Sequence, residues 1–469
     1  MLAVVGGGIS GIAAALELLE QGISPDDLML VEAQDSMGGK IRSIEMAGKR
    51  VEAGPDAFLT RTTAAADLAT RVGLGEELVR PRSFSAAIWA RGKRYPSPEG
   101  IMLGVPVSVG QFVRTSEVLS PLGRLRALLD VVLPKTPLAD DATISHLVRS
   151  RFGREVDEVL VDPMVGGINA GSTTVLGLRA VAPQLLEAYK NSGARSLARS
   201  LVAVVPPRPQ PGARTIPFAS FATGLDTLVR ASEEYLAARG VRILKGARVE
   251  TISNGRGGLT LQLAASGRKR GERIALAGVI LAIPAPSAAA LLSEAARSAS
   301  AKLERIDYAD VAMTVMRYPK SAFAEPLRGS GLLVPRRFGH LVTAVTFASR
   351  KWEHLDLPDS ELLRVSAGRF GDRRFTHMDD TTLQREIAAE LTELMDLRQG
   401  PAEATTWRWQ GALPQYRPFH RELVASIRGN LAETGAVELC GAAYDGVGVP
   451  ACIASGTEAA KRLASRLTG

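Results

Sequence analysis

Three glycines near the start of the chain have the spacing of a phosphate-binding turn. Gly6, Gly8 and Gly11 follow the apolar residues 2–5 in the pattern G-x-G-x-x-G, and apolar residues at helical spacing come next. The first glycine permits a tight turn, the second lets the backbone approach a pyrophosphate, and the third lets helix and strand pack closely. The N-terminus of that helix offers N–H groups and partial positive charge to the same ligand. These residues predict a bound dinucleotide.

Two further features decide which dinucleotide this is. Glu32 ends a second apolar segment roughly 20 residues after Gly11, where a carboxylate can accept hydrogen bonds from ribose hydroxyls. Residues 38–43 read GGKIRS, which resembles the second glycine motif of FAD-dependent, amine-oxidase-like flavoproteins. In that motif, backbone and a cation meet the pyrophosphate and the flavin edge. FAD is therefore favoured over NAD. The alternative is a Gly-Gly turn beside solvated Lys40 and Arg42.

Composition bounds the class of protein. The chain has 469 residues, of which 46% are hydrophobic, so it can bury a large core and is expected to form two or three domains. The formal net charge is +8. Because no basic run is interleaved with aromatic residues, and residues 267–273 read as a hairpin tip, we expect no nucleic-acid partner.

The cysteines, the histidines and the N-terminal residues argue against disulfide-stabilised, metal-binding, secreted and membrane-spanning proteins. Cys440 and Cys452 are the only cysteines and have no metal or disulfide spacing, so a reducing cytoplasm is expected. The five histidines form no metal-like or Ser/His/Asp arrangement, and no metal is predicted. No signal peptide fits before residue 2, and prolines break the longest apolar run, residues 279–292, which cannot span a bilayer.

The hydrophobic patterns predict an α/β plus α+β fold with a discontinuous Rossmann-like domain, and the resemblance implies that this is an FAD domain of the amine-oxidase type. That domain combines residues 1–80, 215–293 and 430–469. Its strands are expected at 215–221, 242–244, 248–253, 259–263, 274–276, 279–284 and 437–441, and its helices at 224–239 and 451–467.

The remaining segments predict two other units. A sheet-bearing substrate domain comprises residues 81–100 and 294–429, and a helical subdomain comprises residues 101–214. The substrate domain has expected strands near 311–317, 330–334, 341–347 and 361–367 and helices at 380–395 and 419–431. The helical subdomain has expected helices at 121–133, 143–152, 154–161, 178–189 and 195–203, with a proline-rich loop at 206–212.

Four motifs extend the resemblance over nearly the whole chain. EAGPDAF at 52–58, GGINAG at 166–171, Leu-Pro-Gln-Tyr at 413–416 and GAAYDGVGVPACI at 441–453 are similar to motifs of the porphyrinogen oxidases of haem biosynthesis. These are FAD enzymes of the amine-oxidase-like superfamily. Asn169 and Ser172 depart from the pattern, which usually has Tyr and Asp there.

The resemblance implies oxidation of a porphyrinogen, with O2 as the electron acceptor. Removal of six electrons and six protons takes three hydride transfers to the flavin and releases three molecules of hydrogen peroxide. The tail GVGVPACI and the segment TAVTFASRKWEH at 343–354 are similar to the branch that oxidises coproporphyrinogen III. This substrate carries four propionates, against two on protoporphyrinogen IX, and so needs more cations. The cations near predicted strand ends are Arg91, Lys93, Arg94, Arg336, Arg337, Arg350 and Lys351.

The resemblance also assigns roles to residues. Asp56 and the carbonyl of Gly167 are the expected acceptors for pyrrole N–H groups; the alternatives are a turn residue and a helix-capping glycine. The expected substrate-binding residues are Arg91, Gly167, Asn169, Leu332, Leu333 and Val365. The expected cofactor-binding residues are Gly6, Gly8, Ile9, Ser10, Gly11, Glu32, Ala33, Gly38, Gly39, Lys40, Arg42, Gly54, Pro55, Asp56, Val249, Ala282, Trp409, Gly441, Val447, Gly448 and Val449.

Other functions stay open on this scaffold. They are a protoporphyrinogen IX oxidase, an amine oxidase or carotenoid desaturase, and a flavin-binding, non-catalytic partner of haem-pathway enzymes. Partners implied by the resemblance include ferrochelatase, and peripheral membrane contact is neither required nor excluded.

Overall fold

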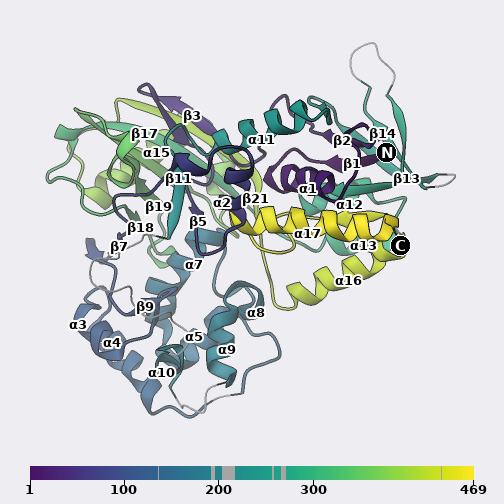
Figure 1. The fold of residues 1–469 in the computed structure, drawn as a ribbon. Helices are drawn as coiled ribbons and strands as arrows, with labels where there is room; N and C mark the ends of the chain where they lie inside the picture. Colours follow the sequence, from purple (N-terminus) through teal and green to yellow (C-terminus); the bar gives the residue numbers. More distant parts are fainter. Residues whose placement is uncertain are drawn as a thin grey trace.

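The structure is a computed structural model that describes residues 1–135, 137–191, 196–202, 217–255, 258–265, 271–434 and 436–468. Figure 1 shows three groups of elements: a parallel sheet between helices, a larger sheet beside it, and a bundle of helices below.

A five-stranded parallel sheet, in the order β12-β2-β1-β16-β22, carries the glycine turn. Its strands are β1 (Leu2–Val5), β2 (Leu28–Val31), β12 (Arg242–Leu244), β16 (Gly278–Leu281) and β22 (Val437–Leu439). They come from distant parts of the chain and, β12 apart, are buried throughout, as expected for a parallel sheet covered on both faces. The predicted Rossmann-like fold class is confirmed.

Alternate residues of these strands face two different cores. Leu2, Val4 and Ile280 pack in the core that includes α1 (Ile9–Glu20), α2 (Ala64–Arg71), α11 (Asp226–Ala238) and α17 (Val449–Thr468). Ala3, Val5 and Val279 pack in the core that includes the antiparallel strands β13 (Val249–Gly255), β14 (Gly258–Leu263) and β15 (Arg273–Leu276), with α12 (Ala285–Leu291), α13 (Arg297–Leu303) and α16 (His420–Ala432). Smaller strands of this part are β3 (Ser43–Met46), β4 (Lys49–Glu52), β5 (Phe58–Leu59), β6 (Leu78–Val79) and β11 (Phe218–Phe221).

A seven-stranded sheet has the order β21-β17-β20-β19-β18-β7-β8. Its strands are β7 (Ala86–Ala90), β8 (Lys93–Pro96), β17 (Tyr308–Pro319), β18 (Gly331–Leu333), β19 (Val342–Phe347), β20 (Ser360–Ala367) and β21 (Glu403–Pro414). Neighbouring strands are antiparallel except β18 and β7. One face packs against α15 (Asp380–Met395).

The helical part carries its own core. Its helices are α3 (Val109–Thr115), α4 (Pro121–Leu128), α5 (Ile144–Phe152), α6 (Arg154–Val156), α7 (Asp162–Asn169), α8 (Leu178–Val181), α9 (Pro183–Asn191) and α10 (Leu197–Val202). Before these helices, β9 (Ile101–Met102) and β10 (Val105–Pro106) form a hairpin. In the part that carries the large sheet, the short helix α14 (Ala348–Lys351) follows β19.

Several predicted bounds need correction. α17 begins at Val449, two residues before the predicted start, and the predicted helix over 154–161 divides into α6 and a π-helix over Asp157–Val161. The proline-rich loop at 206–212 and most of the basic hairpin tip lie outside the described residues. The boundaries of the three predicted domains stay a prediction. None of the described helices is long and apolar enough to cross a membrane.

Candidate flavin and substrate site

The three glycines of the first motif differ in what surrounds them. A Cβ on Gly6 would lie 2.5 Å from the carbonyl oxygen of Ala282, and one on Gly11 would lie 1.9 Å from that of Gly6. A Cβ on Gly8 would meet nothing closer than the Cα of Gly39, at 4.0 Å. The protein's own packing therefore requires glycine at Gly6 and Gly11. At Gly8 it leaves an open approach, as a pyrophosphate needs.

Glu32 ties the glycine turn to the end of β2. Its Oε2 accepts from the N–H of Gly7 at 2.7 Å, and its Oε1 accepts from the N–H of Gln34 at 2.8 Å. A carboxylate has about four lone-pair sites, so acceptor capacity is left for a ribose. Val249 lies nearby at the start of β13, because the N–H of Ala247 donates to the carbonyl of Glu32 at 2.9 Å. Ala33, the residue after Glu32, is exposed.

The second glycine motif packs against the first. The N–H of Gly38 donates to the carbonyl of Gly7 at 2.8 Å, which places Gly39 beside Gly8. Burial lowers the pKa of the Lys40 ammonium, and among the described residues no carboxylate forms an ion pair with it. Arg42 donates to Ser36 Oγ at 2.8 Å. A half-buried cation with no acid among the described residues, beside a glycine turn, fits an anionic ligand such as a pyrophosphate.

The terminal loop is anchored to α17 and to residues that follow β21, and it passes close to Ser10 of α1. The N–H of Gly441 donates to Ser455 Oγ at 3.0 Å, and the Cβ position of Gly441 lies 3.5 Å from Ser10 Oγ. Tyr416 donates its hydroxyl to the carbonyl of Ala442 at 2.5 Å, and the ring of His420 contacts the carbonyl of Ala443 at 2.9 Å.

The end of the loop is the start of the longest helix. Val447 is half-buried and Gly448 is exposed, directly before α17, which begins at Val449. Their N–H groups and the helix N-terminus present partial positive charge. Burial raises the pKa of Cys452 to about 11, so this residue of the first turn stays a neutral thiol.

Asp56 is held by two cations, Lys351 of α14 and Arg364 of β20. Its Oδ2 lies 2.7 Å from Lys351 Nζ and 3.1 Å from an Arg364 nitrogen, and Trp352 Nε1 is at 3.5 Å. Burial by itself would raise the pKa of Asp56, but these two cations outweigh it and hold the pKa well below its ordinary value. The two cations therefore favour the ionised form of Asp56.

Arg364 is a site residue that the sequence motifs did not identify. From β20 it donates to the carbonyl of Glu52 at 2.6 Å and to that of Gly54 at 2.5 Å, besides its ion pair with Asp56. Trp409 Nε1 donates to the carbonyl of Ala53 at 2.8 Å. The sheet thus holds the segment around Pro55 through backbone and side chain. The available signal was an arginine inside the otherwise apolar run LLRV.

Glu52 in this segment yields a prediction on pH. Its side chain is buried, Oε1 accepts from the N–H of Leu225 at 2.6 Å, and burial raises its pKa to about 7 from 4.5. Because the folded state holds this proton more tightly, stability is present in full below pH 4.5 and decreases as the pH rises to about 7. The loss is about 3 kcal/mol.

Glu52→Gln should remove this dependence, since an amide cannot ionise. Urea unfolding at pH 5 and pH 8 should show a smaller difference between the two midpoints than in the wild type. Glu45→Gln, an exposed position on β3, is the matched control and should leave the difference unchanged. An equal difference in Glu52→Gln and the wild type would contradict the assignment.

One face of the seven-stranded sheet is only half buried and looks away from α15. Register places side chains on this half-buried face from five strands; they are Val311, Met313, Leu333, Ala344, Ser366, Trp407 and Trp409. Arg42 of the second glycine motif stacks on Trp407, with 5.1 Å to the ring centroid. Gly167 of α7 borders the same face, because its Cβ position lies 3.9 Å from Leu333 Cδ2.

Three of the predicted substrate-binding side chains are placed elsewhere. Leu332 and Val365 are 1% and 0% exposed in the core under α15, on the opposite face from Leu333. Strand alternation explains this placement, because neighbouring residues point to opposite faces. Asn169 is buried and donates to the carbonyl of Val165 in its own helix at 3.0 Å. These positions do not favour a direct contact with substrate.

Most of the candidate cations have partners within the protein. Arg91 donates to the carbonyls of Glu117 and Val118, each at 2.8 Å, and Arg350 pairs with Glu361. Arg336 and Arg337 pair with acids of the helical part. Lys93 and Arg94 are exposed on β8.

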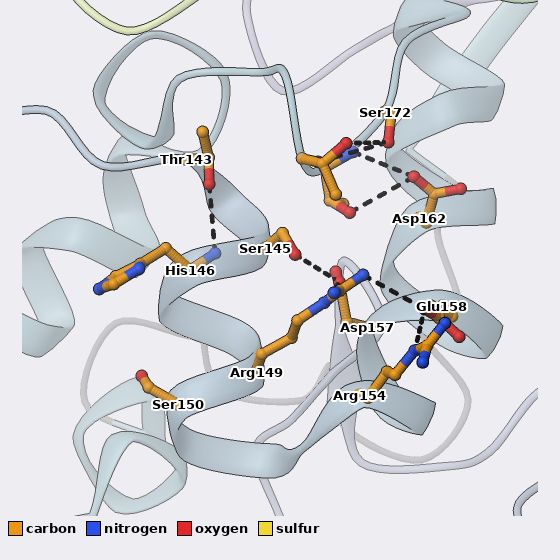
Figure 2. Close-up of polar contacts among 12 residues, drawn as sticks. Thr143, Ser145, His146, Arg149, Ser150, Arg154, Asp157, Glu158, Asp162 and Ser172 are labelled. Atoms are coloured by element: carbon orange, nitrogen blue, oxygen red, sulfur yellow. Dashed lines mark hydrogen bonds and ion pairs between the residues drawn. The ribbon is translucent and has the colours of Figure 1, made fainter.

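Ion pairs and hydrogen bonds link α7 and the π-helix before it to the neighbouring helices and loops, as Figure 2 shows. Asp157, in the π-helix before α7, accepts from Ser145 Oγ and from Arg149 Nε, each at 2.6 Å. Glu158 pairs with Arg154 at 2.5 Å, and Asp162 accepts from the N–H of Thr173 at 3.0 Å. A π-helix is rare and often occurs next to functional sites. Here it leads directly into the helix that carries Gly167.

Comparisons with known proteins agree with this geometry. The family model of flavin containing amine oxidoreductases matches residues 9–464. A coproporphyrinogen III oxidase of Bacillus subtilis (strain 168) is 30% identical over 97% of this chain and 96% of its own. One of Mycobacterium leprae is 32% identical over 98% and 97%. A crystal structure assigned as a protoporphyrinogen oxidase from Exiguobacterium sp. 255-15 has a TM-score of 0.86 and 28% identity, and covers 100% of this chain and 99% of that one.

The predicted resemblance to porphyrinogen oxidases and the predicted flavin-dependent oxidase are confirmed by these full-length similarities. The chain belongs to the family of flavin-containing amine oxidoreductases.

Proposed function

We propose that this protein binds FAD and oxidises coproporphyrinogen III to coproporphyrin III. The observation that carries the proposal is the full-length similarity, at 30% and 32% identity, to relatives that bear this activity in their names. The open approach at Gly8 and the half-buried ammonium of Lys40, which no described carboxylate pairs with, support a dinucleotide in the family's cofactor position.

The cofactor would be held by groups from distant parts of the chain. Gly8 and Lys40 would meet the pyrophosphate, Glu32 a ribose, and the N–H groups of Val447 and Gly448 the flavin ring. When bound, FAD accepts two electrons as hydride and passes them to O2, so three turnovers account for six electrons and three molecules of hydrogen peroxide.

The protein's own contribution would be to bind and orient the macrocycle. The half-buried face of the seven-stranded sheet offers apolar and aromatic side chains to a flat ring and keeps water away from it. The carbonyl of Gly167 and the carboxylate of Asp56 would accept hydrogen bonds from pyrrole N–H groups. Because its pKa is held low, Asp56 orients those N–H groups and does not remove their protons.

Anaerobic reduction of the bound flavin tests the proposal. Purified protein mixed with coproporphyrinogen III under nitrogen should lose its visible flavin absorbance, and admitted O2 should restore it together with fluorescent porphyrin. Protoporphyrinogen IX and a primary amine are the comparison substrates. Bleaching by the amine alone would assign an amine oxidase, and bleaching by none would favour a non-catalytic flavin-binding partner of haem-pathway enzymes. Contact with ferrochelatase stays a prediction.

Substrate preference should depend on salt. Each exposed cation–propionate pair contributes about 0.2–1 kcal/mol, so two extra propionates should give coproporphyrinogen III roughly a two- to thirty-fold advantage in kcat/KM. The exposed Lys93 and Arg94 are cations of this kind. The advantage should shrink as ionic strength rises, because exposed pairs are screened. Equal kcat/KM for both substrates at low salt, or a preference for protoporphyrinogen IX, would reject the substrate assignment and leave the flavoprotein intact.

A further inference from the structure

Arginines gather where the seven-stranded sheet meets α7. Five of them have a carboxylate partner within 4 Å among the described residues. The pairs are Arg336–Asp162 at 3.8 Å, Arg337–Glu158 at 3.5 Å, Arg373–Asp310 at 3.9 Å, Arg374–Asp372 at 2.7 Å and Arg417–Asp307 at 2.6 Å.

Arg369 is the exception in this group. It is 8% exposed, donates from one terminal nitrogen to the carbonyl of His340 at 3.0 Å, and its buried Nε has no acceptor. No carboxylate of the described residues forms an ion pair with it. Burial and the nearby Arg336 lower its pKa to about 10, against the opposing effect of Asp162 and Asp372, which lie near it but do not come within 4 Å. A buried cation that no carboxylate contacts is costly, so this guanidinium is better suited to an anion than to an empty interior.

Arg369 lies at the end of α7 that borders the half-buried face. The N–H of the next residue, Phe370, donates to the carbonyl of Ala170 at 2.6 Å, at the C-terminal end of α7. Arg336 donates to the carbonyls of Phe370 and Gly171, which fixes the same junction. Gly167, one turn earlier in α7, lies beside the half-buried face, because a Cβ built on it would lie 3.9 Å from Leu333 Cδ2.

Two separate positive groups therefore flank this face. Arg364 and Arg369 are five residues apart around the end of β20, which corresponds to about 17 Å of extended chain. At the Arg364 end, the charge is already matched, because Asp56 pairs with both Lys351 and Arg364. At the Arg369 end, a guanidinium with a free Nε can bind a carboxylate in the forked, bidentate way that only arginine offers.

We infer that Arg369 binds a carboxylate on the rim of the substrate, which in the proposed reaction is one propionate of the porphyrinogen. The inference rests on the proposed function for the identity of the ligand. It adds a binding residue that neither the motifs nor the candidate cations had included. Arg336 is then a positioning residue, since it holds Phe370 and α7 through their carbonyls.

Binding of the reaction product tests this inference without turnover. The flavin-loaded protein is titrated with coproporphyrin III and with its tetramethyl ester, and porphyrin fluorescence gives both Kd values. Arg369→Gln should weaken binding of the free acid roughly ten- to hundred-fold, because it removes a charge-assisted contact, and should leave ester binding unchanged. Arg369→Lys keeps the positive charge but loses the bidentate geometry of the guanidinium, so its Kd for the free acid should lie between those of the wild type and Arg369→Gln. Arg373→Gln, on the same segment and 76% exposed, is the control and should change neither Kd more than twofold.

The outcomes separate the inference from the proposed function. If the wild type binds the free acid and Arg369→Gln binds it equally well, the inference is overturned and the proposed function stands. Equal affinity of the wild type for acid and ester also overturns it, even where Arg369→Gln does not fold. A wild type that binds no porphyrin and bleaches with no porphyrinogen overturns the proposed function itself.

Discussion

Gly8→Val should give a folded, colourless protein that takes up no FAD. The φ of Gly8 is −71° and ψ is 170°, which valine adopts readily, and a Cβ there lies 4.0 Å from the nearest protein atom. The valine side chain would instead occupy the approach that a pyrophosphate needs. Absorbance near the flavin bands, circular dichroism and FAD titration of the purified variant measure the two effects separately.

Two other substitutions serve as controls for Gly8→Val. Gly429→Val, at an exposed helical position with open space around it, should keep its flavin. Gly11→Val should fail to fold, because a Cβ would lie 1.9 Å from the carbonyl of Gly6. A Gly8→Val protein that retains stoichiometric flavin would remove the first glycine motif from the cofactor site.

Asp56→Ala should lower activity far more than it lowers flavin content. The substitution leaves Lys351 and Arg364, whose side chains are 10% and 5% exposed, as buried cations without their shared anion. Breaking a buried ion pair from one side costs about 3–5 kcal/mol, and the same change removes the acceptor proposed for pyrrole N–H groups. Urea unfolding, flavin content and kcat with KM for coproporphyrinogen III should be measured on the same preparation.

The pH dependence of Asp56 has the opposite sign to that of Glu52. Because its pKa is lowered in the folded state, Asp56 contributes stability above its ordinary pKa of 3.8, and this stability is lost only as the pH falls below that value. The dependence of activity on pH between pH 5 and 9 should therefore have the same shape in Asp56→Asn as in the wild type. Glu353→Ala removes an exposed carboxylate near Arg82 and is the control. Full activity with an unchanged KM in Asp56→Ala would exclude Asp56 from the reaction.

The local sequence was sufficient for the parallel sheet and its glycine turn. Gly6, Gly8 and Gly11 encode backbone conformation and close packing, which depend on neighbours a few residues away. The sequence likewise predicted four strands of the large sheet, β17 to β20, but not β7, β8 or β21, and apolar runs predicted β1, β2 and β16. These features could be predicted because each depends on the spacing of residues within a single strand, turn or helix.

Only the tertiary structure decided which groups share a site. Arg364, Lys351 and Asp56 are far apart in the chain, and their ion pairs arise because β20 and α14 face the segment after β4. Leu332 and Leu333 are adjacent in sequence, yet the sheet buries one under α15 and turns the other toward Gly167. A residue type shows that a charge is available, but its partners, and so its pKa and its role, depend on which distant segments the fold brings within a few ångströms.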